Sequence, residues 1–233
     1  MSCSISSVAP RHWRPRLARF GAVVFDMDGV LVDGEPLHFR AINELLGEEG
    51  KSISLEAYKP YMGTKAGWRD MAADIGLKLP ADSYSGRYDD LILDQYRKAS
   101  VALPGAITLV RSLQEANIPI AVCSSSRRTW VETCLEKIGI LDAFDVTVTG
   151  GDVEHGKPAP DIYLLSAERL SLHPELCLAI EDAPAGIQSA TAAGMTVWAV
   201  RTEYTEGLDL PPNDRELRSL EEINLADIVG VAA

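Results

Sequence analysis

Five short apolar runs, each closed by polar or glycine-rich residues, constrain the fold of this chain more than any other feature. Each run has the length of a β-strand and lacks the polar alternation of a strand with one wet face, so we expect both faces to be buried. Helical patterns separate the runs. This alternation predicts a doubly wound α/β domain built on a parallel sheet. The runs occupy residues 20–26, 118–123, 144–148, 176–180 and 196–200.

A long helical stretch interrupts this alternation between the first and second runs. Residues 35–103 contain helical patterns at 38–48 and 86–98 and no convincing strand, and a Leu-Pro-Gly sequence then returns the chain to strand–helix repeats. We therefore expect a helical cap at 35–103, inserted between two hinges and lying over the ends of the strands. The α/β core would comprise residues 20–34 and 104–233.

The first nineteen residues differ in character from the rest. Residues 1–20 hold four arginines and four serines but no acid, which is the profile of an organelle transit peptide. Compositional signals in so short a segment are weak, so we favour a disordered leader at 1–19 on a cytoplasmic protein and keep the transit peptide as the alternative. The cysteines form no Cys-x-x-Cys pair and no Cys/His cluster, which fits a reducing compartment.

The charge of the chain narrows its partners. A net charge of −12 opposes binding to nucleic acid and to anionic membranes, so we expect neither as a partner. No apolar stretch approaches the length that a bilayer span needs. We expect a monomer or a weak dimer. If the substrate is anionic, the binding site must supply local cations against the unfavourable overall charge.

Chemically active side chains gather where the apolar runs end. Ligands of open α/β sheets bind outside the carboxyl ends of the strands, so residues that follow different runs should meet at one edge. Two acids follow the first run, hydroxyls and an arginine the second, a lysine the third, and two acids the fourth. In the order of the runs these are Asp26 and Asp28; Ser124, Ser125, Ser126 and Arg127; Lys157; and Glu181 and Asp182.

That set of side chains suits phosphoryl transfer. Clustered carboxylates resist ionisation unless a cation holds them, and oxygen ligands select a hard cation, for which Mg²⁺ is the best candidate. A carboxylate can attack phosphorus to form an acyl phosphate, while the cation and Lys157 neutralise the transferring group. An acid two residues from the nucleophile can protonate the leaving group and then deprotonate water. We therefore expect a small phosphorylated metabolite as substrate and Mg²⁺ as cofactor.

Four motifs carry a resemblance to a known family. The run Asp26-Met27-Asp28-Gly29-Val30 resembles the Asp-x-Asp-Gly-Val/Thr nucleophile motif of the haloacid dehalogenase superfamily. Ser124 after an apolar strand is similar to its second motif, and Lys157 in Gly-Lys-Pro to its third. Glu181 and Asp182 are similar to the fourth. All four occur in the family's order and spacing, over about residues 20–202.

The resemblance is closest to the subgroup that contains β-phosphoglucomutase and phosphoglycolate phosphatase. It implies a Rossmann-like core with a helical cap inserted after the first motif. It also implies Asp26 as the nucleophile and Asp28 as the general acid/base. Mg²⁺ would be held by Asp26, the backbone carbonyl of Asp28 and Asp182, with Glu181 either a direct ligand or one layer further out.

The remaining site residues would bind substrate. The resemblance implies that Ser124 and Lys157 bind the phosphoryl group. A histidine in the mutase branch helps to position the acid/base residue, and a cap loop there sets substrate specificity. Each of these cap side chains has a bland alternative as a solvated surface residue or helix start. The expected substrate contacts are Ser125, Ser126 and Arg127 in the core, and His38, Lys65, Trp68 and Arg69 in the cap.

Two reactions fit these motifs, hydrolysis by a phosphatase and phosphoryl transfer by a mutase. The mutase branch carries a threonine in the first hinge and an arginine in the cap loop, where this chain has Gly34 and Ala66. We therefore expect a phosphatase of small phosphomonoesters, such as sugar phosphates or phosphoglycolate, with a sugar-phosphate mutase as the alternative. A further alternative is a non-catalytic metabolite- or partner-binding module, which would be marked by a missing motif acid. None is missing.

Overall fold

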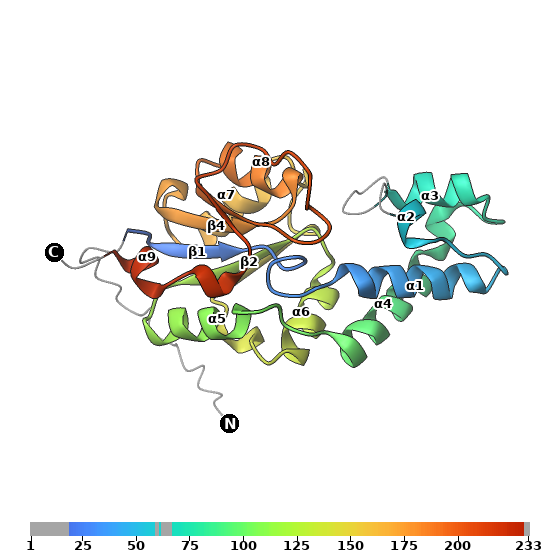
Figure 1. The fold of residues 1–233 in the computed structure, drawn as a ribbon, viewed down its shortest axis with the longest axis horizontal. Helices are drawn as coiled ribbons and strands as arrows, with labels where there is room; N and C mark the ends of the chain where they lie inside the picture. The colour runs from blue at the N-terminus through green and yellow to red at the C-terminus, as the bar shows by residue number, and fades with distance from the viewer. Residues whose placement is uncertain (1–18, 59–60, 62–66, 231–233) are drawn as a thin grey trace, which may run out of the picture.

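The computed structural model describes residues 19–58, 61 and 67–230, and it confirms the predicted α/β fold (Figure 1). Six parallel strands form one sheet in the order β3-β2-β1-β4-β5-β6. The first strand therefore lies inside the sheet, and its residue Val24 pairs with Ala121 on one side and Ala179 on the other. The strands are β1 Ala22–Phe25, β2 Ile120–Ser124, β3 Val146–Thr149, β4 Cys177–Glu181, β5 Thr196–Val200 and β6 Arg215–Leu217.

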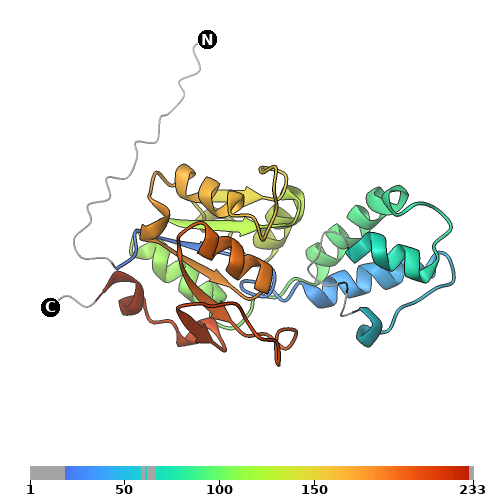
Figure 2. The same cartoon turned by 90° about the horizontal axis from the view of Figure 1, so that it is seen from above.

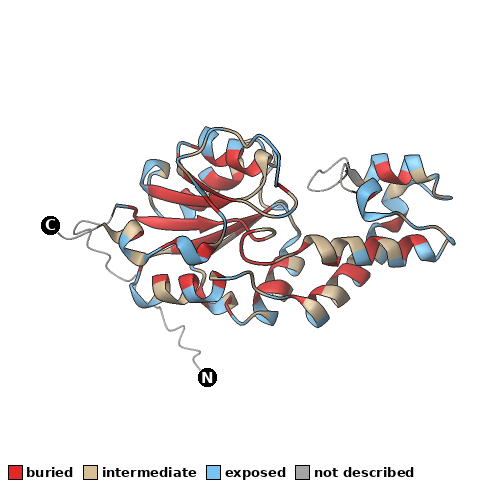
Figure 3. Ribbon diagram, viewed as in Figure 1, coloured by how far each residue is buried: buried red, intermediate tan, exposed pale blue. Residues whose placement is uncertain are grey.

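Helices cover both faces of the sheet, which explains why the strands lack polar alternation. In β1, Val23 and Phe25 pack into the core that faces helices α5 and α6, while Ala22 and Val24 pack into the core that faces α7 and α8. The central strands are accordingly buried along their length (Figure 3). The helices are α5 Ala106–Glu115, α6 Arg128–Lys137, α7 Asp161–Arg169, α8 Pro184–Ala192 and α9 Leu225–Val229.

The stretch between β1 and α5 is helical, and within its described part the structure assigns no strand. Helices α1 and α4 pack side by side, and α4 also packs against α6 (Figure 1). Helices α2 and α3 close a small core against α1 around Ile42, Leu46 and Met71. Figure 2 shows this insert to one side of the sheet. Its elements are α1 Glu35–Gly47, α2 Leu55–Tyr58, α3 Gly67–Ile75, the 3₁₀ turn η2 Ala81–Tyr84, and α4 Ser85–Ala99.

Parts of the sequence-based expectations fall outside the described residues. The leader predicted at 1–19 is described only at its last residue, and Lys65 lies in the undescribed segment 62–66. The sixth strand, β6, was not predicted. Among the residues that the structure does describe, none of the helices combines the length and the apolar character that crossing a membrane requires.

Candidate active site

The carboxyl ends of β1, β2 and β4 bring the motif residues together. Asp26 follows β1 directly, and its backbone N–H donates to the carbonyl of Ile180 on the neighbouring strand at 2.9 Å. Ser124 is the last residue of β2 and Glu181 the last of β4, and both are buried. Because the strands run parallel and in register, residues more than 150 positions apart reach the same edge of the sheet.

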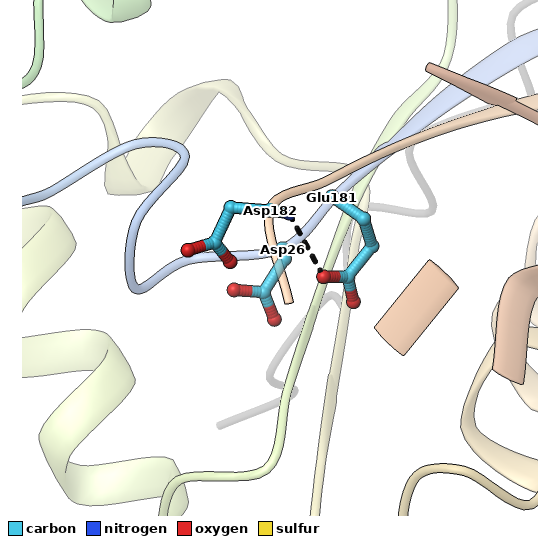
Figure 4. A group of neighbouring side chains, drawn as sticks. All are labelled: Asp26, Glu181 and Asp182. Atoms are coloured by element: carbon cyan, nitrogen blue, oxygen red, sulfur yellow. Dashed lines mark hydrogen bonds between the residues drawn. The ribbon is translucent and has the colours of Figure 1, made fainter. Parts of the chain in front are cut away.

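Three acids form a compact oxygen-rich group at this edge. One carboxylate oxygen of each of Asp26, Glu181 and Asp182 lies within 4.8 Å of the others (Figure 4). Burial raises the pKa of Asp26 to about 8, and the charge on Glu181 adds to this effect, although Lys157 opposes it. Burial also raises the pKa of Asp182, and the charges on Asp26 and Glu181 raise it further. Such a group is stabilised by a divalent cation.

Lys157 bridges two of these acids. Its Nζ donates to Oδ1 of Asp26 and to Oε1 of Glu181, each at 2.5 Å. The same Oε1 accepts a 2.5 Å hydrogen bond from the hydroxyl of Tyr163, and Oε2 accepts from the backbone N–H groups of Asp182 and Ala183 at 3.2 and 3.4 Å. Glu181 therefore has protein donors on both oxygens, and it fixes the ammonium group next to Asp26.

Asp28 sits on the turn after β1 and is held at both oxygens. The hydroxyl of Tyr96 donates to Oδ1 and that of Ser126 to Oδ2, both at 3.3 Å. Burial raises the pKa of Asp28, while the nearby His38 and these two hydrogen bonds oppose the rise. A neighbouring glycine makes room for this carboxyl group, since a Cβ at Gly34 would collide with Oδ1 of Asp28.

His38 reaches Asp28 through an intermediary. Its Nε2 lies 3.0 Å from the hydroxyl of Tyr96, which in turn contacts Asp28, and its Nδ1 lies 2.5 Å from the hydroxyl of Tyr88. Burial lowers the pKa of His38, although the charge on Asp28 opposes this. Tyr96 and Tyr163 are contacts that the sequence analysis missed. An aromatic residue on an amphipathic helix is ordinarily a core residue. The only sequence feature that could have suggested a polar contact is that each of these residues has a hydroxyl group.

The other predicted residues divide into two groups. Ser125, Ser126, Arg127 and Trp68 line the same large cavity, of about 1610 Å³, as the acids. Arg127 is also paired with Asp89 of α4 at 2.6 Å.

Arg69 does not belong to that lining. It is exposed and pairs with Asp82 at 3.1 Å, so the structure does not bring it to the site.

The loop after β2 is held by its own side chain, because the hydroxyl of Ser124 accepts a hydrogen bond from the backbone N–H of Ser126 at 3.1 Å.

Comparison with known proteins adds independent findings. Residues 20–194 match the family described as "Hydrolase: haloacid dehalogenase-like hydrolase". Fructose-1-phosphate phosphatase YqaB of Escherichia coli is 34% identical over 186 residues, which cover 78% of this chain and 97% of that protein. Protein SUPPRESSOR OF QUENCHING 1, chloroplastic, of Arabidopsis thaliana is 34% identical over 87% of this chain, and the chain spans only 19% of its length.

The fold is shared with solved structures. CbbY from Rhodobacter sphaeroides in complex with phosphate superimposes with a TM-score of 0.82 at 27% identity, covering 90% of this chain and 99% of that one. A mutant of the same protein in complex with xylulose-(1,5)-bisphosphate gives the same TM-score, identity and coverage.

Proposed function

The chain belongs to the haloacid dehalogenase-like hydrolases, and from this membership we propose that it is a magnesium-dependent phosphatase that forms an aspartyl-phosphate on Asp26. The observation that carries the proposal is the convergence of Asp26, Asp28, Ser124, Lys157 and Asp182 on one cavity. The relative named fructose-1-phosphate phosphatase supports a sugar-phosphate substrate.

The residues of this chain divide the chemistry between them. The carboxylate of Asp26 attacks phosphorus, and the bond between phosphorus and the leaving oxygen breaks as Asp28 donates a proton to that oxygen. Asp28, now a carboxylate, takes a proton from a water molecule that attacks the phosphorus. The acyl phosphate then opens to give inorganic phosphate and free Asp26. Ser124 and Lys157 bind the non-bridging oxygens throughout.

Mg²⁺ fits the donor set at the strand edge. Asp26, Asp182 and the backbone carbonyl of Asp28 would hold it, because hard oxygen ligands gathered around a carboxylate of raised pKa suit this cation. Its contribution would be to neutralise charge on the transferring phosphoryl group. Both oxygens of Glu181 already accept protein hydrogen bonds, which favours a role for Glu181 outside the ligand set, as the residue that orients Lys157.

The charges around the cavity favour hydrolysis over mutase chemistry, which requires a second phosphate site. Among the described residues that line the cavity, every lysine and arginine has a carboxylate partner. Asp33, Glu35 and Glu203 also line the cavity and add acidic groups to it. Burial, followed by the charges on Asp28 and Asp33, raises the pKa of Glu35 to about 7. A cavity lined by these acids, without an unpaired lysine or arginine among the described lining residues, favours a neutral, hydroxyl-rich leaving group such as a sugar.

The insert at 35–103 is proposed to act as the cap of this site, with His38, Trp68 and the core residues Ser125, Ser126 and Arg127 around the leaving group. The buried thiols of Cys123, Cys134 and Cys177 suit a reducing compartment, so we propose a cytoplasmic protein, with an organelle as the alternative. A monomer or weak dimer remains our proposal for its assembly.

The proposal is tested by steady-state kinetics. Wild type and Asp26→Asn are assayed with a panel of sugar phosphates and p-nitrophenyl phosphate, in Mg²⁺ and in chelator. Turnover by wild type in Mg²⁺ alone is the expected result. Turnover by Asp26→Asn, or by chelated enzyme, would rule out the covalent, metal-dependent route. Incubation with β-glucose 1-phosphate and a bisphosphate primer tests the mutase alternative, and the absence of any turnover would favour a binding module.

A further inference from the structure

A chain of hydrogen bonds leads from the insert to the carboxyl group of Asp28. The hydroxyl of Tyr88 lies 2.5 Å from Nδ1 of His38, and Nε2 of His38 lies 3.0 Å from the hydroxyl of Tyr96. The hydroxyl of Tyr96 then donates to Oδ1 of Asp28 at 3.3 Å. Tyr88 and Tyr96 lie on α4 and His38 on the neighbouring α1, so two packed helices of the insert build the chain (Figure 1).

Counting protons gives the chain a direction. Tyr96 has one hydroxyl proton and donates it to Asp28, so its bond with His38 must use the proton on Nε2. A neutral imidazole carries only one N–H, and Nδ1 therefore accepts the proton of Tyr88. Every donor in the series points towards Asp28. Tyr96 is fully buried, and its ring packs edge-on against the imidazole of His38 at a centroid distance of 5.8 Å, so the position of its hydroxyl oxygen is fixed.

The two oxygens of Asp28 differ in consequence. Oδ1 faces a donor whose direction is fixed by His38, and it cannot readily carry a proton of its own. Oδ2 faces the hydroxyl of Ser126, which can rotate from donor to acceptor. A neutral Asp28 therefore carries its proton on Oδ2, and Tyr96 fixes the rotation of the carboxyl group about its side-chain bonds.

We propose that Tyr96, held by His38 and Tyr88, is a positioning residue that orients the Oδ2 proton of Asp28 for transfer to the leaving group. This inference rests on the proposed function, because it requires Asp28 to act as the general acid. It adds two tyrosines of α4 to the reaction and gives His38 an indirect role. This series of hydrogen bonds affects the rate only when the leaving oxygen must be protonated. The need for a proton can be varied by choosing substrates whose leaving groups differ in basicity.

Leaving groups of different basicity separate orientation of the acid from general damage. A sugar alkoxide is a strong base and must be protonated as it departs, whereas p-nitrophenolate is a weak base that departs unaided. The value of kcat/KM reports the steps up to release of the leaving group. The later hydrolysis of the aspartyl-phosphate is common to both substrates and does not affect it. The probes are p-nitrophenyl phosphate and the sugar phosphate that wild type cleaves fastest.

Tyr96→Phe removes one oxygen atom and should lower kcat/KM for the sugar phosphate by about 10- to 100-fold, because Asp28 becomes a carboxylate as its proton leaves and loses a hydrogen bond to that charged group. The loss with p-nitrophenyl phosphate should stay below about threefold. Tyr84→Phe is the matched control, since it removes the hydrogen-bonded hydroxyl of another buried tyrosine of the insert, which contacts Glu49 and the N–H of Leu79. It should leave the ratio of the two kcat/KM values unchanged.

Tyr88→Phe provides the second variant, because Tyr88 is only half-buried and its loss is less disruptive to folding. It should shift the ratio in the same direction by about three- to tenfold. Equal losses on both substrates, or no loss, in either folded tyrosine variant would overturn the positioning role. Asp28→Asn separates the two hypotheses. If that variant shows no dependence on the leaving group, the general-acid role itself fails, whatever the tyrosine variants do.

Discussion

Nζ of Lys157 lies 2.5 Å from Oδ1 of Asp26, and the side chains of both residues are almost fully enclosed. A buried carboxylate needs a cation to remain charged, and a charged Asp26 is what nucleophilic attack requires. The same ammonium group also contacts Glu181 at 2.5 Å. In the proposed mechanism, Lys157 would therefore stabilise the charged form of Asp26 before the reaction as well as the phosphoryl group during transfer.

Replacing Lys157 by methionine removes this cation while keeping much of the side-chain volume. We expect kcat/KM to fall by about 10²–10³-fold, because charge on the phosphoryl group loses a stabilising partner. The free energy of unfolding should fall by about 3 kcal/mol in chelator, because Asp26 and Glu181 lose their shared partner. Kinetics and thermal denaturation measure the two effects. The exposed Lys137→Met is the control, and activity within tenfold of wild type would contradict the assignment.

Gly34 predicts an unusual separation of activity from stability. Its φ of −80° and ψ of −29° suit any residue, yet a Cβ there would collide with the carboxyl group of Asp28. Gly34→Ala should therefore displace Asp28 and lower kcat/KM for a sugar phosphate at least about tenfold, with little change in melting temperature. Gly47→Ala, where a Cβ meets nothing within 4 Å, should leave activity unchanged. Full activity in Gly34→Ala would show that Asp28 tolerates displacement.

Metal binding predicts a stability signal that is independent of turnover. Mg²⁺ at 100 times its dissociation constant should stabilise the folded chain by about 2.7 kcal/mol, measurable as a rise in melting temperature. Asp182→Asn should abolish most of this rise, because it removes one proposed ligand. Asp90→Asn, an exposed acid on α4, should retain it. An undiminished rise in Asp182→Asn would place the cation elsewhere.

Asp152 predicts a defined pH dependence of stability. It accepts from the N–H and the hydroxyl of Thr149 at 2.8 and 2.7 Å, and it pairs with Arg128 and Arg169. Burial alone would raise the pKa of Asp152, but these hydrogen bonds and charges outweigh burial and hold the pKa at about 2. A depressed pKa stabilises the folded state above the unfolded value of 3.8, and this contribution disappears as the pH falls towards 2.

Asp152→Asn should therefore lower the free energy of unfolding at pH 7 by about 1 kcal/mol, since water screens part of the interaction. The difference from wild type should shrink as the pH is lowered from about 4 to about 2. Urea unfolding at several pH values measures it. Asp94→Asn, which breaks an exposed pair with Lys98, should show little difference at any pH. A gap for Asp152→Asn that widens in acid would reverse the assigned sign.

The sheet and its catalytic edge were predictable because burial on two faces leaves a direct trace in sequence. Five of the six strands lie within or beside continuous apolar runs, and the acids that follow them were placed correctly at one edge. The sixth strand, β6, has the sequence Arg-Glu-Leu and only one buried residue, so hydrophobicity could not reveal it. Edge strands of this kind are defined by pairing with a neighbour, which the local sequence does not record.

Contacts between distant segments were the least predictable part of the site. Arg127 was expected to meet substrate, and its pairing with Asp89 depends on how α4 lies against α6. Tyr96 belongs to the apolar face of its helix, so its pattern predicts burial and says nothing of the hydroxyl group. Such roles follow from the position of a single polar atom after packing, whereas periodicity reports only which face is buried.

Helix α4 contributes an ion pair with Arg127 of the α/β core and, through Tyr96, a hydrogen-bond donor to Asp28. A chimera that exchanges the insert with that of a relative would therefore alter the reaction as well as the substrate range, unless the incoming helix brings an equivalent hydroxyl group. Substitutions within this family should accordingly be tolerated more easily at Trp68 of α3 than at Tyr96 of α4. The helical insert and the α/β core therefore depend on each other at the site, and a change in one of them requires a compensating change in the other.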